Sequence, residues 1–366
     1  MRHDLRVIRA VALKDIRSAL TERLFTIISI VLPLNFLLLF LLFVLTGGEA
    51  PTAVVMDDTG PYGQQFLQAL QTSHSFIIQQ TDAATAQRLM AQGRIVAVIT
   101  VPATFDAALQ SGQSVSVPVA VNNLELDYTN DIRRAVPLAI TSFYAQAFPD
   151  QVVVHAAEID VQPYDTGYIE YLSVSIVVVS LLVGGLLQAG SNAAREYETG
   201  TIKELLLAPA SRWAIEAGKV LAAVALNVLS AGLVLGVVVL VLQVRPTHWP
   251  ELIGFTLLVM LTFVALGLLL GTLVRSRNAV VPLSLGLALP VFFISGAFGP
   301  VQWGTPVLAT VAQLQPVYYA IAVFQYAFHG FQTTPFSVAT NAIVLACFTL
   351  VIVSVSAIAL RLRATP

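Results

Sequence analysis

A run of 83 residues, from Asn278 to Leu360, contains no Lys, Arg, Asp or Glu. A soluble domain carries a charge on about a quarter of its residues, so a run of this length cannot form a water-exposed surface. Over the whole chain of 366 residues, 57% are hydrophobic, 11% are charged and the mean hydropathy is +0.80. These values predict a polytopic α-helical membrane protein.

The remaining composition excludes several classes of protein. A net charge of -2 excludes a nucleic-acid binder that relies on bulk positive charge. The single cysteine, Cys347, lies in an apolar stretch and excludes a disulfide framework or a cysteine metal site. The five histidines match no spacing of metal ligands, so no metal site is expected.

Apolar segments of about 20 residues, the length that crosses a bilayer as a helix, locate the membrane spans. Two breaks rich in Gly, Pro and aromatic residues divide the uncharged run, at Gly296–Pro306 and at His329–Pro335. The segment 299–335 between the last two spans is predicted to be re-entrant or interfacial on the outer side. Six spans result, at 26–46, 171–194, 220–244, 252–274, 279–294 and 336–360.

Basic residues near span ends favour the cytoplasm and therefore predict the orientation. With both termini inside, 14 of the 19 Lys and Arg residues are cytoplasmic, and four of the other five lie in the long outer segment. Only Arg245 is misplaced. A seven-span alternative would put Arg361 and Arg363, in the tail 361–366, outside.

Residues 1–25 are predicted to form a cytoplasmic amphipathic helix at the inner headgroups. Apolar residues recur every three to four positions, and basic residues lie off that stripe. The apolar positions are Leu5, Ile8, Ala12, Ile16 and Leu20, and the basic ones are Arg6, Arg9, Lys14 and Arg17.

Residues 47–168 have the composition of a water-soluble domain, and we expect this domain outside the cytoplasm. From Glu49 to Glu170 there are 13 acidic and 4 basic residues, which gives about -9. Alternating patterns predict a small α/β unit. Its strands are predicted at 52–58, 75–80, 94–102 and 115–121, and its helices at 62–71, 83–92, 105–110 and 127–148.

The sequence contains no nucleotide-binding loop. The Gly218–Lys219 pair lacks both the upstream glycine and the following Ser or Thr. Charged residues all lie at or beyond the predicted span ends, so an ion relay through the membrane is not expected either. Active transport by this chain would need an external motor.

The loop 193–214, between the second and third spans, carries the most specific motif, which ends at the start of the third span. Residues 193–221 read AAREYETGTIKELLLAPASRWAIEAGKVL, with a short helix predicted at 202–207. This pattern resembles the signature of ABC type-2 transporter permeases, the membrane subunits of ABC exporters. Lys203 is a departure, because many members have an acidic residue there. The matching residues are Arg195, Glu196, Gly200, Thr201, Leu205, Leu206, Pro209, Gly218 and Lys219.

The resemblance implies that the short helix couples this chain to a separate ATPase subunit, which would bind the ATP and magnesium. This chain would then have no catalytic residue and no cofactor of its own, and it would lie in the bacterial cytoplasmic (inner) membrane. The implied ATPase-coupling residues are Arg195, Glu196, Glu198, Gly200, Thr201, Lys203, Glu204, Leu205, Leu206 and Pro209. The turn at 275–278 is a candidate for a second, weaker contact.

The resemblance also implies a homodimer, or a heterodimer with a paralogous permease, that encloses a substrate path and contacts membrane lipid. An apolar path favours a hydrophobic or amphiphilic substrate, such as a drug or lipid. Ser173, Ser175, Ser180, Ser284, Phe292 and Phe293 are candidates for lining the path, although serines in spans also bond neighbouring helices. Gly184, Gly185 and Gly190 are expected to allow close helix packing.

Two functions of other classes are alternatives. A membrane receptor or assembly scaffold could use the outer domain to bind a ligand and the loop to recruit a partner, without transport. An intramembrane enzyme is disfavoured, because the sequence shows no zinc motif, paired intramembrane aspartates or nucleophile elbow.

Overall fold

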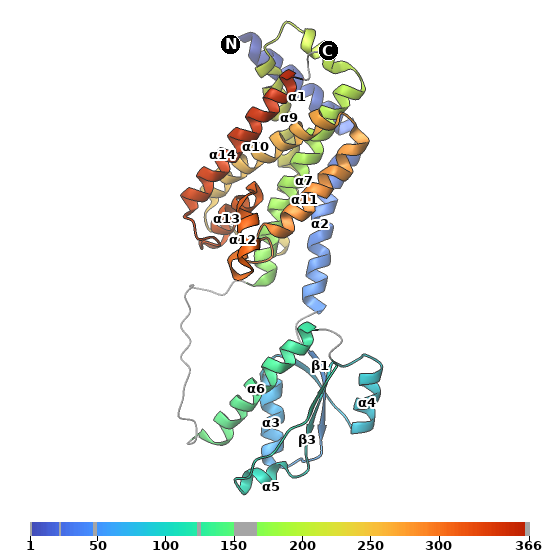
Figure 1. Ribbon diagram of the computed structural model, residues 1–366. Helices are drawn as coiled ribbons and strands as arrows, with labels where there is room; N and C mark the ends of the chain where they lie inside the picture. The colour runs from blue at the N-terminus through green and yellow to red at the C-terminus, as the bar shows by residue number, and fades with distance from the viewer. Residues whose placement is uncertain (1, 22, 47–49, 123–125, 150–166, 363–366) are drawn as a thin grey trace. The chain divides into compact units, whose positions relative to one another are not determined.

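The computed structural model describes residues 2–21, 23–46, 50–122, 126–149 and 167–362. The chain forms two compact units, a helical unit and a smaller α/β unit (Figure 1). The helical unit comprises Met1–Leu41 and Val161–Pro366, and the α/β unit comprises Leu42–Asp160. Most of the predicted tail, 361–366, lies outside the described residues.

Ten α-helices of the described residues build the helical unit. They are α1 (Arg2–Thr21), α2 (Arg23–Thr46), α7 (Tyr168–Glu198), α8 (Thr201–Leu207), α9 (Arg212–Gly236), α10 (Trp249–Val274), α11 (Arg277–Ile294), α12 (Pro306–Gln313), α13 (Pro316–His329) and α14 (Val338–Leu362). A π-helical turn, η2 (Val237–Val241), continues α9, and a 3-10 turn, η3 (Val301–Trp303), precedes α12.

Five described helices are long and apolar enough to cross a membrane: α7, α9 with η2, α10, α11 and α14. The pair α12 and α13 is bent by 94° and would be either a broken span or a re-entrant loop. Helix α2 occupies the predicted first span, but its described side chains give a shorter apolar stretch, Ile27–Leu39. A polytopic helical membrane protein is thus confirmed, whereas six crossings remain a prediction.

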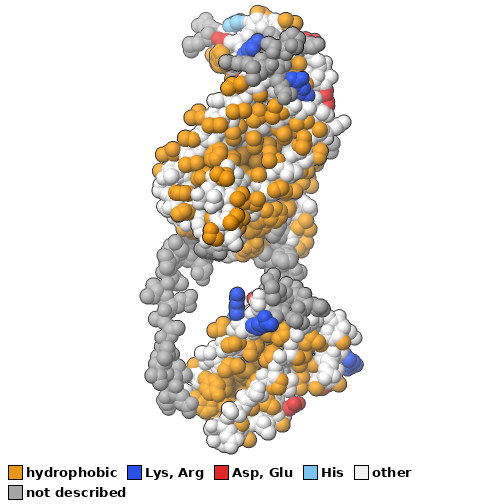
Figure 2. All heavy atoms as spheres, in the orientation of Figure 1, with side chains coloured by type: hydrophobic (Ala, Val, Ile, Leu, Met, Phe, Trp, Pro, Cys, Tyr) orange, Lys and Arg blue, Asp and Glu red, His pale blue; other side chains and the backbone are white. Residues whose placement is uncertain are grey.

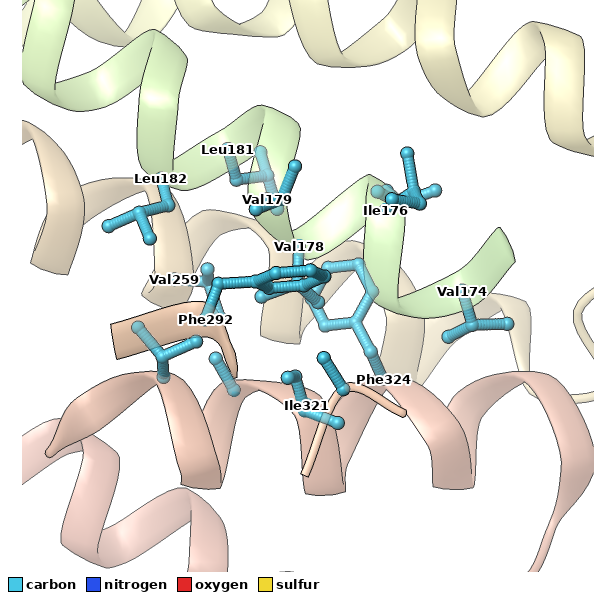
Figure 3. Packing of buried hydrophobic residues seen from close by; sticks show 14 of the residues in the cluster. Val174, Ile176, Val178, Val179, Leu181, Leu182, Val259, Phe292, Ile321 and Phe324 are labelled. Carbon is cyan, nitrogen blue, oxygen red and sulfur yellow. The ribbon is translucent and has the colours of Figure 1, made fainter. Parts of the chain in front are cut away.

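Helix α7 is the centre of the helical unit. Its most apolar window is completely buried, whereas only 22% of the corresponding window of α11 and 17% of that of α14 are buried. Val178 of α7, Phe292 of α11 and Phe324 of α13 lie in one apolar cluster (Figure 3). A helix that is apolar on all sides must be enclosed by other helices or lipid, and here other helices of the chain enclose it.

The backbones of α7 and α10 approach each other along a seam of glycines. A β-carbon added at Gly267 would overlap the carbonyl oxygen of Gly185, and one at Gly271 would overlap that of Gly190. A β-carbon added at Gly184 would likewise overlap the side-chain amide oxygen of Asn227 on α9. Small residues allow this approach, and the expectation of close packing at these glycines is confirmed.

The surface of the helical unit separates apolar from charged regions. Apolar side chains cover most of its length, and the charged side chains visible in this view gather at the end that carries α1 and α8 (Figures 1 and 2). The C-terminal end of α14 lies at that same end (Figure 1). Exposed aromatic residues of the kind found at membrane interfaces lie near the ends of three long helices: Tyr168, Trp213 and Trp249.

The α/β unit contains the strands and helices predicted from the sequence. They are β1 (Ala50–Met56), α3 (Pro61–Thr72), β2 (Phe76–Gln80), α4 (Ala83–Ala91), β3 (Ala97–Val101), α5 (Phe105–Gln110), β4 (Val119–Val121) and α6 (Leu126–Ala147). β4 is shorter than predicted, because Pro118 has no N–H for a strand ladder.

The four strands form one sheet in the order β2-β1-β3-β4. β1 is parallel to β2 and β3, and β4 runs antiparallel to β3, with Val98 opposite Ala120. Successive side chains point to opposite faces. On β1, Val54 therefore packs with α3, α5 and α6, whereas Val55 packs with α4.

Candidate functional site

The candidate site is the junction of α7, α8 and α9, together with α1, which packs against it. Gly200 separates α7 from α8 and has a φ of +74° and a ψ of -2°. An added β-carbon would meet no atom within 4 Å, so this left-handed conformation, and not lack of space, requires glycine here. Ala208 is extended before Pro209, as a residue preceding proline must be, and this ends α8.

Helix α1 is attached to the segment that follows α8. Nε2 of His3 donates to the carbonyl oxygen of Pro209 at 3.0 Å, and the hydroxyl of Ser211 donates to Asp4 at 2.9 Å. The bond from Ser211 lowers the pKa of Asp4. Gly218 allows α1 to lie close to α9, because an added β-carbon would be 2.8 Å from Cβ of Val11.

Glu196, in the last turn of α7, is the electrostatic centre of the junction. Its side chain is 5% exposed and accepts hydrogen bonds from Lys14 of α1, at 2.6 Å, and from Lys219 of α9. Lys14 also pairs with the buried Asp15 at 3.1 Å. A buried carboxylate needs such partners, because an unpaired charge in the interior is strongly unfavourable.

Three further contacts connect the end of α7 with neighbouring segments. Arg195 donates to the hydroxyl of Ser18 on α1. Glu198 accepts a hydrogen bond from the backbone N–H of Arg277 at 2.7 Å, and the guanidinium of Arg275 lies 5.0 Å from the centre of the Tyr197 ring. The turn at 275–278 therefore lies beside the end of α7.

A pocket of about 370 Å³ lies between α1, the end of α7 and α8. Among the described residues, no group of three or more His, Cys, Asp or Glu side chains is placed to hold a metal ion. Both basic and acidic side chains line the pocket, and its walls are Lys14, Asp15, Ser18, Asn192, Arg195, Glu196, Thr199, Thr201, Glu204, Leu205 and Ala208.

The coupling residues named from the sequence differ in what surrounds them. Arg195 contacts α1 and Glu196 contacts both α1 and α9, whereas Glu198, Glu204 and Pro209 are exposed. Thr201 and Leu205 are partly exposed walls of the pocket. The side chains of Lys203 and Leu206 lie outside the described part of the chain.

Sequence reasoning missed three residues of this junction. Lys14 and Asp15 belong to a helix that was assigned only to the headgroup surface, and Leu207, which is 85% exposed, was not singled out. The position of Asp15, between the apolar residues Ala12 and Ile16, was a signal for a buried charge.

The three candidate path serines of α7 are fully buried. Each hydroxyl donates to a carbonyl oxygen of α7 itself, and Ser175 also accepts a hydrogen bond from Gln325 of α13 at 3.2 Å. These bonds satisfy Ser173, Ser175 and Ser180 inside the chain. They are the structural contacts that serines often make in membrane helices.

The three candidates on α11 differ in exposure. Ser284 and Phe292 are buried, whereas Phe293 is 52% exposed. Phe293 stacks on Phe298 at 5.0 Å and meets the ring edge of Phe36, on α2, at 6.1 Å. Of the six path candidates, Phe293 is the side chain that reaches the surface.

Comparison with known proteins identifies the family. A family described as "ABC-2 family transporter protein" matches residues 23–358. A "Probable multidrug ABC transporter permease YbhR" from Escherichia coli (strain K12) is 26% identical over 129 residues, and so is that from Escherichia coli O157:H7. Each alignment spans 35% of this chain and 35% of the relative. The family consists of permease subunits that work with an ATPase partner, and this multi-pass membrane protein belongs to the ABC-2 transporter family.

Proposed function

We propose that this chain is the permease subunit of an ABC exporter that moves a hydrophobic or amphiphilic substrate, drug-like or lipid-like, outward. A separate ATPase subunit drives alternating access. In this proposal two copies enclose the path, or one copy pairs with a paralogous permease. Six spans place both termini and α8 in the cytoplasm and the α/β unit outside, in agreement with the distribution of basic residues.

One observation carries the proposal: α8 presents exposed side chains while its flanking helices are fixed. Glu204 and Leu207 are exposed on α8, and the buried Glu196 joins α7 to α1 and α9. A partner that displaces α8 would therefore move α1, α7 and α9 together, as a rigid group. Such rigid-body motion is a common way to switch a membrane path between two states.

Substrate contact is proposed for the exposed face of α11 at Phe293. The buried candidates Ser173, Ser175, Ser180, Ser284 and Phe292 would meet substrate only where α11 separates from α7 during the cycle. The lack of charged residues in the middle of the predicted spans supports an uncharged or amphiphilic cargo.

The test is co-expression with a candidate ABC ATPase, for which a reading frame beside the gene with a nucleotide-binding loop is the first choice. We expect the ATPase to co-purify with this chain. We also expect inverted vesicles that contain both proteins to take up a fluorescent amphiphilic dye when ATP is added. The double variant Glu204→Ala/Leu207→Ala should lose ATPase association, whereas Glu251→Ala, at an exposed site in the first turn of α10, should retain it.

Unchanged association of the Glu204→Ala/Leu207→Ala variant would exclude α8 as the coupling element. Labelling of Glu204→Cys in intact cells by a reagent that cannot cross the membrane would exclude the proposed orientation. This labelling requires Cys347, which is exposed, to be replaced by alanine.

A further inference from the structure

The sheet of the α/β unit ends at an open edge. Its strand order is β2-β1-β3-β4, so β2 pairs with β1 on one side only. The carbonyl oxygen of Ser75 and the N–H of Thr81 bond backbone groups of β1, at 3.0 Å and 3.1 Å. Backbone groups alternate in direction along a strand. The outward-facing N–H and C=O groups of β2 are therefore those of Phe76, Ile78 and Gln80.

This edge lacks features that commonly keep an edge strand from pairing. Many natural edge strands carry a lysine, a proline or a bulge. β2 reads FIIQQ, with neither a charged residue nor a proline, and Ile77 is 56% exposed. The other edge strand, β4, has only three residues and directly follows Pro118. Of the two edges, β2 is the one suited to accept another strand.

The surface at this edge is uncharged, although the unit as a whole is acidic. From Glu49 to Glu170 there are 13 acidic and 4 basic residues, yet the stretch 59–81, which contains α3 and β2, has none. α3 and β2 share one apolar cluster through Phe66 and Phe76. Depletion of charge is typical of the centre of a protein interface, and it lets two acidic units approach each other. The exposed glutamines of α3 and β2 are Gln64, Gln65, Gln68, Gln71, Gln79 and Gln80.

A second copy of β2 fits this edge. Around a two-fold axis β2 meets itself in antiparallel orientation. Pairing centred on Ile78 puts Ile78 opposite its counterpart and Phe76 opposite Gln80, so all the outward N–H and C=O groups of the strand find partners. On the other face of the sheet Ile77 then lies opposite Gln79, which covers part of its exposed apolar surface.

We propose that β2 pairs with β2 of a second copy of this chain and joins the two four-stranded sheets across a two-fold axis. The inference rests on the dimer of the proposed function, and it favours two copies of this chain over a paralogous partner. Copies that are held in one membrane dimer meet at a high effective concentration. A pair of five-residue strands can therefore form even though it would be weak between separate molecules.

The first test is disulfide cross-linking of the full chain in native membranes, with Cys347 replaced by alanine. Two differently tagged copies are co-expressed, one with Ile77→Cys and the other with Gln79→Cys. We expect oxidation to join them, because these positions lie opposite each other in the proposed pair. Copies that both carry Ala120→Cys, which is exposed on β4 at the other edge, should not be joined.

The second test separates the pair by charge. Ile77→Lys/Gln79→Lys changes two exposed side chains and would put lysine opposite lysine twice, which should lower the pairing constant by roughly twofold to thirtyfold. Hydrogen exchange of the full chain should then become faster in β2 but not in β1 or β3. Ser116→Lys/Ala120→Lys adds the same charge at exposed positions of the other edge and should leave exchange in β2 unchanged.

Several results would overturn the proposal. If tagged copies co-purify but the Ile77→Cys and Gln79→Cys copies do not cross-link, the assignment of β2 fails and the dimer of the proposed function stands. Protection of β2 from exchange without this cross-link would assign the edge to a different protein. Equal cross-linking of Ala120→Cys would indicate chance collision. Absence of co-purification would remove the homodimer together with this inference.

Discussion

Glu196 at the end of α7 and Lys219 near the start of α9 form an ion pair in which both side chains are almost fully buried. The two residues flank α8 in the sequence, and the pair holds together the helices that lead into and out of it. Lys14 adds α1 to the same carboxylate. The α8 loop is thus attached to three helices through one acidic group.

Lys219→Met is expected to destabilise the protein. The change leaves Glu196 with Lys14, whose side chain is 47% exposed, as its remaining ammonium partner. Loss of one partner of a buried ion pair costs about 3–5 kcal/mol. Thermal unfolding of the purified chain in detergent should show a lower midpoint.

The double variant Glu196→Gln/Lys219→Met tests whether charge is the cause. Because it removes both members of the pair, it should recover part of the stability lost in Lys219→Met. A double variant less stable than Lys219→Met would show that packing, and not the unpaired carboxylate, dominates.

Gly271→Ala should disturb the contact of α10 with α7. The new methyl group would overlap the carbonyl oxygen of Gly190, and overpacking costs typically about 1–3 kcal/mol. Gly254→Ala is the matched control on the same helix, because no atom lies within 4 Å of its added β-carbon. We expect a lower unfolding midpoint for Gly271→Ala but not for Gly254→Ala. Equal midpoints for the two variants would contradict the close contact between α7 and α10.

Gly200→Ala should weaken ATPase association without unfolding the chain. A left-handed conformation at alanine costs roughly 1–2 kcal/mol, and the strain would be confined to the turn before α8. Gly200→Asn should behave more like the parent, because asparagine tolerates this conformation. Co-purification measures association, and a matching loss in both variants would rule out backbone conformation as the cause.

The α/β unit should be sensitive to acid through Asp58. Its carboxylate accepts hydrogen bonds from the backbone N–H groups of Asp106 and Gly60, both at 2.9 Å, and they hold the pKa of Asp58 below its ordinary value of 3.8. A lowered pKa means that this stabilisation is present above about pH 3.8 and is lost as pH falls through the folded pKa.

The acid sensitivity can be measured as hydrogen exchange of β1 and β3 in the full chain, corrected for the intrinsic effect of pH. We expect protection to fall in acid, and to depend less on pH in Asp58→Asn, which cannot ionise. An identical acid midpoint in the variant would assign the effect to another group.

Local signals in the sequence sufficed for most of the helices and strands. The long helices could be predicted because a helix that crosses a bilayer requires a long, uncharged apolar segment. Helix α8 could be predicted because Gly200 and Pro209 each determine the conformation of their own backbone. The elements of the α/β unit follow from alternating and helical periodicity. The sequence also placed the glycines of α7 at a close contact, but it could not name Gly267 and Gly271 as their partners.

The sequence by itself determined membrane character, the α/β unit and the family. Composition, periodicity and the motif at 193–221 depend on residues that are close together in the chain. Only the tertiary structure decided that Glu196 faces inward, since Lys14 lies 182 residues away along the chain. It likewise decided that Ser175 is satisfied by Gln325 and that β2 lies at an edge of its sheet. Burial and hydrogen-bond partners arise from segments distant in sequence, and no local pattern specifies which of them meet.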